Sequence, residues 1–119
     1  KSYHINEAIE LISKDYDADS LVSVVKVPHN MNIESLMYRE GKYIKKVISN
    51  DKQILRRQDK KNYYARNGAA IYITKSSIIN KSILGDKILF YEMSKLYSID
   101  IDDEIDFKMA ELIMKDLDK

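Results

Sequence analysis

The sequence has no cysteine and no tryptophan, and it has only one proline and three glycines among its 119 residues. Without cysteine the chain has neither disulfides nor thiolate metal sites, which fits a reducing, cytoplasmic setting. An excess of one charge is missing too, because 20 Lys and Arg side chains face 19 Asp and Glu, for a net charge of +1. This balance gives no global field for nucleic acid or an anionic membrane surface.

Long apolar runs are absent as well. No stretch approaches the roughly 20 apolar residues of a membrane span, and the first residues do not form the apolar region of a signal peptide. The apolar share of 45% and the charged share of 33% are instead typical of a globular domain. We expect one domain or part of one, and the initial Lys favours a fragment of a longer protein.

The first thirty or so residues have the pattern of a helix followed by a buried strand. Apolar side chains recur at helical spacing from about His4 to Lys14, and Ser2 is placed to cap that helix. Leu21–Val27 is almost continuously apolar and rich in β-branched residues, which is typical of a strand buried on both faces, and Pro28 ends it. A helix leading into such a strand predicts an α/β fold.

The C-terminal part of the sequence continues the alternation of strands and helices. A second buried strand is expected at Ala69–Thr74, and a third strand, whose side chains alternate between two faces, at Lys87–Met93. A short helix that Ser76 or Ser77 would cap separates them. A last amphipathic helix should run from Asp103 to about Leu117.

The middle of the chain has a different composition. Leu36–Tyr38 and Tyr43–Ile48 flank a Gly-containing turn and predict a hairpin with polar, Lys-rich strands. Such a hairpin is stable only when it packs against something else, for example a second subunit. Asn50–Asn62, which follows, is polar and basic, and we expect a loop or an extended arm.

Five carboxylates fall within the seven residues from Asp100 to Asp106, and two interpretations fit them. If Ser98–Asp102 is extended, the side chains of Asp100 and Asp102 lie on the same side, about 7 Å apart, and both can reach one Mg²⁺. Alternatively, acidic residues at a helix start cap the helix and stabilise its dipole. Taken alone, the segment favours the cap.

Two further groups of residues suggest binding. Arg56-Arg57-Gln58, followed by the aromatic pair Tyr63-Tyr64, could clamp phosphate oxygens, form a solvated basic loop, or bind nucleic acid. The near-zero net charge makes nucleic acid the weakest of the three. Asn67-Gly68, just before a strand, either lets the backbone approach a ligand and offers it an amide, or forms an ordinary turn.

Several of these stretches occur together in one order and spacing. They are Arg56-Arg57-Gln58-Asp59, Tyr64-Ala65-Arg66-Asn67-Gly68-Ala69-Ala70-Ile71-Tyr72-Ile73, and Ser98-Ile99-Asp100-Ile101-Asp102, together with Ala18-Asp19-Ser20-Leu21-Val22-Ser23-Val24 and Val27-Pro28-His29. In combination they resemble the acylneuraminate cytidylyltransferase family, the enzymes that make CMP-activated sialic acid and its relatives. The resemblance spans essentially the whole chain.

The resemblance implies a nucleotide-diphospho-sugar transferase-like (Rossmann-like) three-layer α/β fold. Residues 1–119 would be about its C-terminal half, with 30–63 a β-hairpin dimerisation arm. The implied reaction is attack of the anomeric hydroxyl of a nonulosonic (sialic-type) acid on the α-phosphate of CTP, with Mg²⁺ as cofactor and pyrophosphate as leaving group. The implied enzyme is a cytoplasmic homodimer. The CTP-binding loop of the family has no counterpart here, so we expect the fragment alone to be inactive.

The resemblance also assigns functions to individual residues. Asp100 and Asp102 match the metal-binding aspartates of the family, and with this match we favour ligation over capping for these two. Arg57 matches an arginine that reaches the active site from the dimerisation arm, and Gln58 beside it could assist. Asn67 matches a sugar-contacting asparagine.

Two more positions, Ile83 and Leu84, fall where some members of the family place an apolar pair against the acyl group of the sugar. Some members also have an arginine where this chain has Ala65. The particular nonulosonic acid is therefore open. The alternative to an enzyme is a non-catalytic module that binds anions or nucleic acid through its basic segment or serves in assembly.

Overall fold

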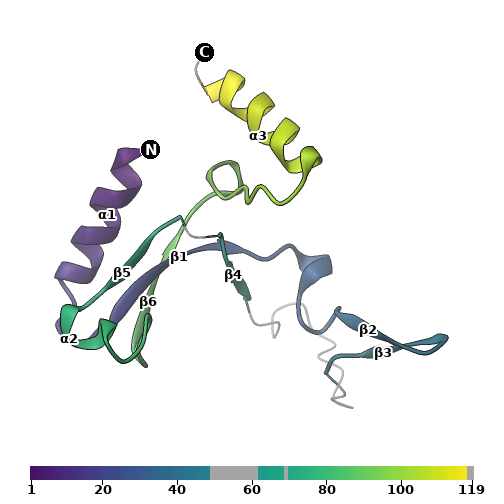
Figure 1. Cartoon of the computed structure of the whole chain (residues 1–119), viewed down its shortest axis with the longest axis horizontal. Coiled ribbons are helices and arrows are strands. Elements are labelled where there is room, and N and C mark those ends of the chain that lie inside the picture. The colour runs from purple at the N-terminus through teal and green to yellow at the C-terminus, as the bar shows by residue number, and fades with distance from the viewer. Residues whose placement is uncertain (49–61, 69, 118–119) are drawn as a thin grey trace. The chain divides into compact units, whose positions relative to one another are not determined.

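The computed structural model describes residues 1–48, 62–68 and 70–117 of the chain. They form two compact units, one of Lys1–Val25 with Arg66–Lys119 and the other of Lys26–Ala65. We call these the sheet unit and the hairpin unit. Figure 1 shows their helices and strands. No helix within the described ranges is long and apolar enough to span a membrane.

A mixed four-stranded sheet confirms the expected α/β class. Its strands are β1 (Ser20–Lys26), β4 (Tyr64–Arg66), β5 (Tyr72–Thr74) and β6 (Ile88–Glu92). Leu21 of β1 lies opposite Ile73 of β5 in an antiparallel pair and opposite Leu89 of β6 in a parallel pair. Because β1 and β6 are parallel, their carboxyl ends lie at the same edge of the sheet.

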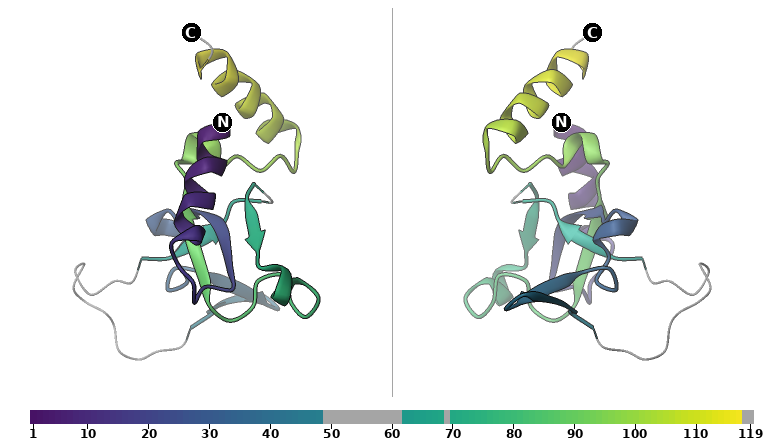
Figure 2. Two further views of the ribbon diagram at one scale, coloured as in Figure 1. Left: turned by 90° about the vertical axis from the view of Figure 1, so that its left-hand side faces the viewer. Right: turned by 90° about the vertical axis from the view of Figure 1, so that its right-hand side faces the viewer.

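The strand β1 is the centre of the sheet unit. Its first five residues are buried, as the almost continuously apolar run predicts. The helix α1 (Ser2–Ser13) packs Ala8 against a core of Leu21, Ile71 and Met93, and Figure 2 shows α1 beside the sheet. This core holds the carboxyl ends of β1 and β6 in place.

Two predicted caps are wrong. Ser2 is the first residue of α1 rather than its cap, and Lys1 at the N-cap makes no side-chain bond to the helix. The short helix α2 (Ser76–Ile79) likewise follows Lys75, and Ser76 lies inside it. A serine near a helix start is a weak signal because the cap is decided by the backbone angles at that residue.

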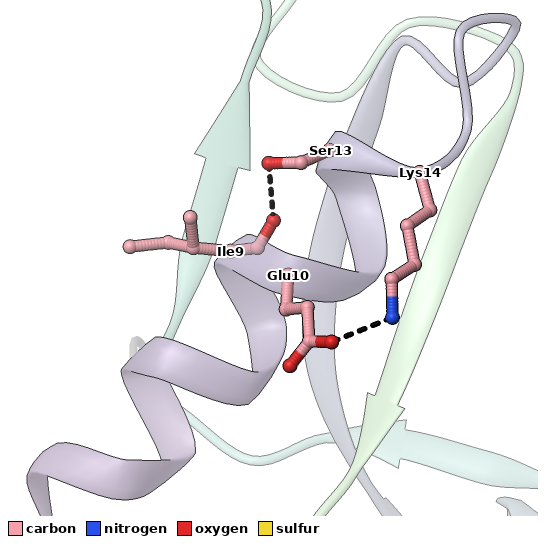
Figure 3. A network of polar contacts seen from close by, with 4 residues as sticks. All are labelled: Ile9, Glu10, Ser13 and Lys14. Atoms are coloured by element: carbon pink, nitrogen blue, oxygen red, sulfur yellow. Dashed lines mark hydrogen bonds and ion pairs between the residues drawn. The ribbon is translucent and has the colours of Figure 1, made fainter.

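The last turn of α1 is fixed by polar contacts on its exposed side, which Figure 3 shows. Ser13 Oγ donates to the carbonyl oxygen of Ile9, one turn back along the helix, at 2.6 Å. Lys14 Nζ donates to Glu10 Oε1 at 2.5 Å, and this ammonium lowers the pKa of the Glu10 carboxyl.

A buried polar group joins α1 to β6. His4 Nδ1 lies 3.0 Å from Tyr91 Oη, and Tyr91 in turn donates to Glu7 Oε2. His4 Nδ1 is therefore the donor toward Tyr91. Burial lowers the pKa of His4 and raises the pKa of Tyr91 to about 12. His4 is thus a structural residue.

The hairpin unit confirms the predicted hairpin. Its strands are β2 (Met37–Glu40) and β3 (Tyr43–Lys46), which are antiparallel and fully exposed along their length. The 3₁₀ turn η1 (His29–Met31) precedes them. Tyr63 closes the unit, because its carbonyl oxygen accepts from Val27 N and its hydroxyl donates to Glu34 Oε1, both at 2.9 Å.

Asp19 organises the turn that leads into β6. Its Oδ2 accepts the backbone N–H of Asp86 at 2.9 Å and of Lys87 at 3.0 Å. The turn comes very close to it at Gly85, where φ is +70° and an added Cβ would lie 2.6 Å from Asp19 Cβ. The amides of Lys87 and Asp86 hold the pKa of the Asp19 carboxyl below its usual range.

The low pKa of Asp19 makes stability depend on pH. A carboxyl whose pKa is lowered by folding stabilises the protein above its unfolded pKa of about 4, and this stabilisation is lost as pH falls through the folded value. We expect Asp19→Asn to reduce the fall in Tm between about pH 5 and pH 2.5. Thermal unfolding by circular dichroism measures it. Asp17→Asn is the control, and an unchanged pH profile for Asp19→Asn would contradict the assignment.

Candidate functional site

The site lies where β6 ends and the chain turns toward α3 (Glu104–Leu117). Met93, the first residue after β6, is buried and its N–H donates to the carbonyl oxygen of Val24 at 2.8 Å. The 3₁₀ turn η3 (Lys95–Tyr97) follows, and Ser98 Oγ donates back to the carbonyl oxygen of Ser94 at 2.8 Å. These bonds fix the start of the acidic segment at the carboxyl edge of the sheet.

Two of the five carboxylates in this segment serve the helix. Asp103 Oδ1 accepts the N–H of Ile105 at 2.8 Å and of Asp106 at 2.9 Å, which is the bonding of an N-cap. Asp106 Oδ2 reaches back to the N–H of Asp102 and Asp103, both at 3.2 Å. The pair forms a reciprocal capping box. The capping interpretation therefore holds for Asp103 and Asp106, and it does not use the carboxylates of Asp100 and Asp102.

The Asp100 carboxylate lies directly against Gly68. A Cβ added to Gly68 would lie 3.1 Å from the carboxyl carbon and from both oxygens of Asp100. Gly68 has φ of +66°, a left-handed conformation that other residues rarely adopt. The backbone conformation thus favours glycine here, and an added Cβ would displace the Asp100 carboxylate by a few tenths of an ångström. Close approach of this backbone to a ligand stays a prediction.

Asn67 is buried, and both polar atoms of its side chain are hydrogen-bonded. Its Oδ1 accepts from Ser23 Oγ at 2.7 Å, and its Nδ2 donates to Ser98 Oγ at 3.0 Å and to Met93 Sδ at 3.3 Å. Ser23 Oγ also accepts the N–H of Ile71 at 2.9 Å. We call Ser23, Asn67 and Ser98 the Asn67 network. It links the middle of β1 to the segment that carries Asp100.

Asp100 and Asp102 are both exposed and present hard oxygen ligands. Within residues 1–48, 62–68 and 70–117, three or more His, Cys, Asp or Glu side chains nowhere gather in a geometry suited to a metal ion. Two carboxylates are nevertheless a common protein share of a Mg²⁺ site, because this ion keeps several waters and binds substrate phosphates. The exposed pair fits Mg²⁺ in its donor chemistry and in its access to solvent.

Comparison with known proteins identifies the chain's relatives. It is 34% identical over 108 residues to the N-acylneuraminate cytidylyltransferase of Streptococcus agalactiae serotype V, and the aligned stretch covers 90% of this chain and 25% of that protein. It is 36% identical over 109 residues to N-acylneuraminate cytidylyltransferase A of Danio rerio, covering 91% and 25%. The chain is homologous to the N-acylneuraminate cytidylyltransferases. Its resemblance to that family is thereby confirmed.

The chain spans about a quarter of the length of these cytidylyltransferase relatives, whose name makes them nucleotidyltransferases. A further relative, "Post-translational flagellin modification protein B" of Campylobacter coli, is 29% identical over 100 residues, covering 82% of this chain and 41% of that protein. No protein-family profile matches the sequence.

Further residues were matched to the cytidylyltransferases by their sequence motifs. Arg57 and Gln58 fall outside the described residues, so their assignment stays a prediction. Tyr63, which follows them, is held by Glu34, and this bond raises the pKa of its hydroxyl. The Tyr63 hydroxyl is therefore hydrogen-bonded within the hairpin unit.

Ile83 and Leu84 lie at the opposite end of the sheet from Asp100. The carbonyl oxygen of Leu84 accepts from Ser20 Oγ, at the first residue of β1, and that of Ile83 accepts from Thr74 Oγ1. Figure 1 shows the loop after α2 at one end of the sheet and the segment before α3 at the other. Within one chain the structure does not bring this pair to the carboxylates, and its sugar contact stays a prediction.

Sequence reasoning missed Ser23 and Ser98. The signal for Ser23 was present, because it is the one polar side chain in Leu21–Val25, and a buried hydroxyl needs a partner. Ser98 gave no such signal, because its role depends on the chain returning to Asn67.

Gly68→Ala tests the contact with Asp100. We expect a loss of stability of about 1–2 kcal/mol from the left-handed backbone, and in addition a displaced Asp100 and at least roughly tenfold weaker Mn²⁺ binding. Mn²⁺ titration followed by water-proton relaxation measures the affinity in the natural polypeptide that contains these residues.

Gly41→Ala is the matched control for this variant. Gly41 has φ of +62° with nothing within 4 Å of an added Cβ, so it carries the backbone strain without the carboxylate. Equal Mn²⁺ affinity in the two variants would show that the Gly68 contact does not position a metal ligand.

Proposed function

We propose that this chain supplies the metal-binding part of a CTP-dependent cytidylyltransferase that converts a nonulosonic acid to its CMP-sugar and releases pyrophosphate. The observation that carries the proposal is the Asp100 carboxylate, held against Gly68 at the carboxyl edge of a mixed sheet in a homologue of such enzymes. Ligands of α/β sheets bind at this edge, because loops there meet the ends of parallel strands. A Rossmann-like architecture and a cytoplasmic location are part of the proposal.

Asp100 and Asp102 would hold Mg²⁺. When bound, this ion neutralises charge on the reacting phosphate and on the departing pyrophosphate. The residues of this chain contribute position: the capping box of Asp103 and Asp106 fixes the backbone just after Asp102, and Gly68 limits where the Asp100 carboxylate can lie. Exposure of both carboxylates leaves them open to substrate oxygens.

The remaining assignments complete the proposed site. Arg57 would clamp anionic groups of the substrates as a bidentate donor, with Gln58 assisting. Ile83 with Leu84 would contact the acyl group of the sugar. The anomeric hydroxyl of the sugar would then attack the α-phosphate of CTP.

The proposal includes a homodimer formed through the hairpin unit. Side chains on both β2 and β3 are exposed although many are apolar, among them Met37 at 54%, Tyr43 at 65% and Ile44 at 63% exposure. A two-stranded hairpin is at best marginally stable in water by itself. A second copy of the chain would cover these side chains and could bring Arg57 to the site of its neighbour.

Asp102→Asn tests the metal ligand. Loss of the carboxylate charge should lower CMP-sugar formation by the natural polypeptide roughly a hundredfold or more at saturating Mg²⁺, with Tm unchanged within a few degrees. Coupled detection of pyrophosphate measures the rate.

Asp103→Asn is the control for Asp102→Asn, since it makes the same change of charge one residue away. Asn caps a helix as well as Asp does, so activity should stay near that of the unmodified protein. Normal turnover by Asp102→Asn would refute its role as ligand. Salt-sensitive binding of anions without any turnover would favour the non-catalytic module.

Ile44→Lys tests the dimer. A charge placed in the proposed interface should weaken dimerisation at least roughly tenfold, because a buried unpaired ammonium is strongly disfavoured. Sedimentation velocity across a concentration series gives the constant. Ile79→Lys, at a 56% exposed position of α2, is the control that should leave it unchanged. A monomeric unmodified protein would remove the dimer from the proposal.

A further inference from the structure

We infer that Asn67 is a positioning residue for the metal-binding carboxylate, acting through Ser23 and Ser98; the inference rests on the proposed function. The side-chain amide of Asn67 is connected to both chain segments that meet where Gly68 contacts Asp100. Asn67 itself precedes Gly68, and its partner Ser98 stands two residues before Asp100. The distance between the glycine and the carboxylate is thus set by the Asn67 network.

The hydrogen bonds of the network determine the orientation of the amide. The Ser98 hydroxyl donates its single proton to the carbonyl oxygen of Ser94. Its Oγ can therefore only accept a hydrogen bond from Asn67. Ser23 Oγ accepts the N–H of Ile71, and it donates to Asn67 Oδ1 at 2.7 Å, a much shorter contact than the 3.3 Å to the Ile71 carbonyl oxygen. Asn67 therefore presents Oδ1 to Ser23 and Nδ2 to Ser98, and an aspartate there would lose the donor and bury a charge.

Burial separates this role from direct substrate contact. Asn67 is 6% exposed and Ser23 is 0% exposed, whereas the Asp100 carboxylate is exposed. Both ends of the Asn67 amide are bound to the protein, on Ser23 at one end and on Ser98 and Met93 at the other. Because both ends of this amide are hydrogen-bonded within the protein, Asn67 affects the reaction by positioning its partner residues.

The two roles predict different measurements. A positioning residue alters metal affinity and leaves the KM of the sugar unchanged, whereas a sugar contact raises that KM and leaves metal affinity unchanged. Ser98→Ala is the sharpest variant, because Ser98 is half buried and its hydroxyl can be removed without a cavity in the core. It deletes the acceptor of Asn67 Nδ2 and keeps every metal ligand.

We expect Ser98→Ala to weaken Mn²⁺ binding about tenfold, the equivalent of one lost hydrogen bond, and to raise the half-saturating Mg²⁺ by the same factor. Water-proton relaxation with MnCl₂ measures the first quantity. Amide signals of Gly68 and Asp100 in metal-free protein should shift as well. Ser98→Thr keeps the hydroxyl and should restore affinity to within about threefold of the unmodified protein.

Ser94→Ala is the matched control, since Ser94 enters the network only through its carbonyl oxygen. Ser98→Ala with Mn²⁺ affinity within twofold of this control, or with a change confined to the KM of the sugar, would overturn the inference. Asp102→Asn distinguishes the two levels. If that variant binds Mn²⁺ normally, the proposed metal site fails; if it does not but Ser98→Ala does, only the positioning role fails.

Discussion

The proposed site depends on the burial of the Asn67 side-chain amide. A buried amide left without partners is destabilising by about 1–3 kcal/mol per group, so its oxygen and nitrogen must both be satisfied within the protein. The partners come from segments distant in sequence, 44 residues away at Ser23 and 31 residues away at Ser98. The network is complete only when all three segments are in register. The hydrogen bonds of Asn67 therefore connect the sheet to the segment that carries Asp100.

The parallel pairing of β1 with β6 is what allows three distant segments to meet. It brings the carboxyl end of β6 beside Val24, and the bond from Met93 N to Val24 continues the ladder to the last buried residue. Ala8 of α1 and Leu21 pack behind this edge. A rigid, buried support of this kind holds a polar site more exactly than a loop could, because its side chains have few alternative rotamers.

Prediction from the sequence succeeded where a local pattern determines the structure. The apolar run of β1 and the alternation in β6 each specify a strand whatever surrounds them. It failed where tertiary contacts decide. β5 is three half-buried residues rather than the longer buried strand expected at Ala69–Thr74. The similarity of motifs predicts roles for Asp100 and Asn67, but only the folded chain shows that Asn67 is bound inward and that Leu84 lies at the opposite end of the sheet.

The acidic segment shows how one run of like charges can serve two purposes. Five carboxylates in seven residues repel one another, and that repulsion is relieved where an oxygen accepts backbone N–H groups or meets a helix dipole. Asp103 and Asp106 are relieved in this way at the start of α3. Asp100 and Asp102 lie outside the cap and are exposed, so their oxygens are available to the divalent cation that we propose they bind. The helix cap therefore does not occupy the two carboxylates that the cytidylyltransferase resemblance assigns to the metal.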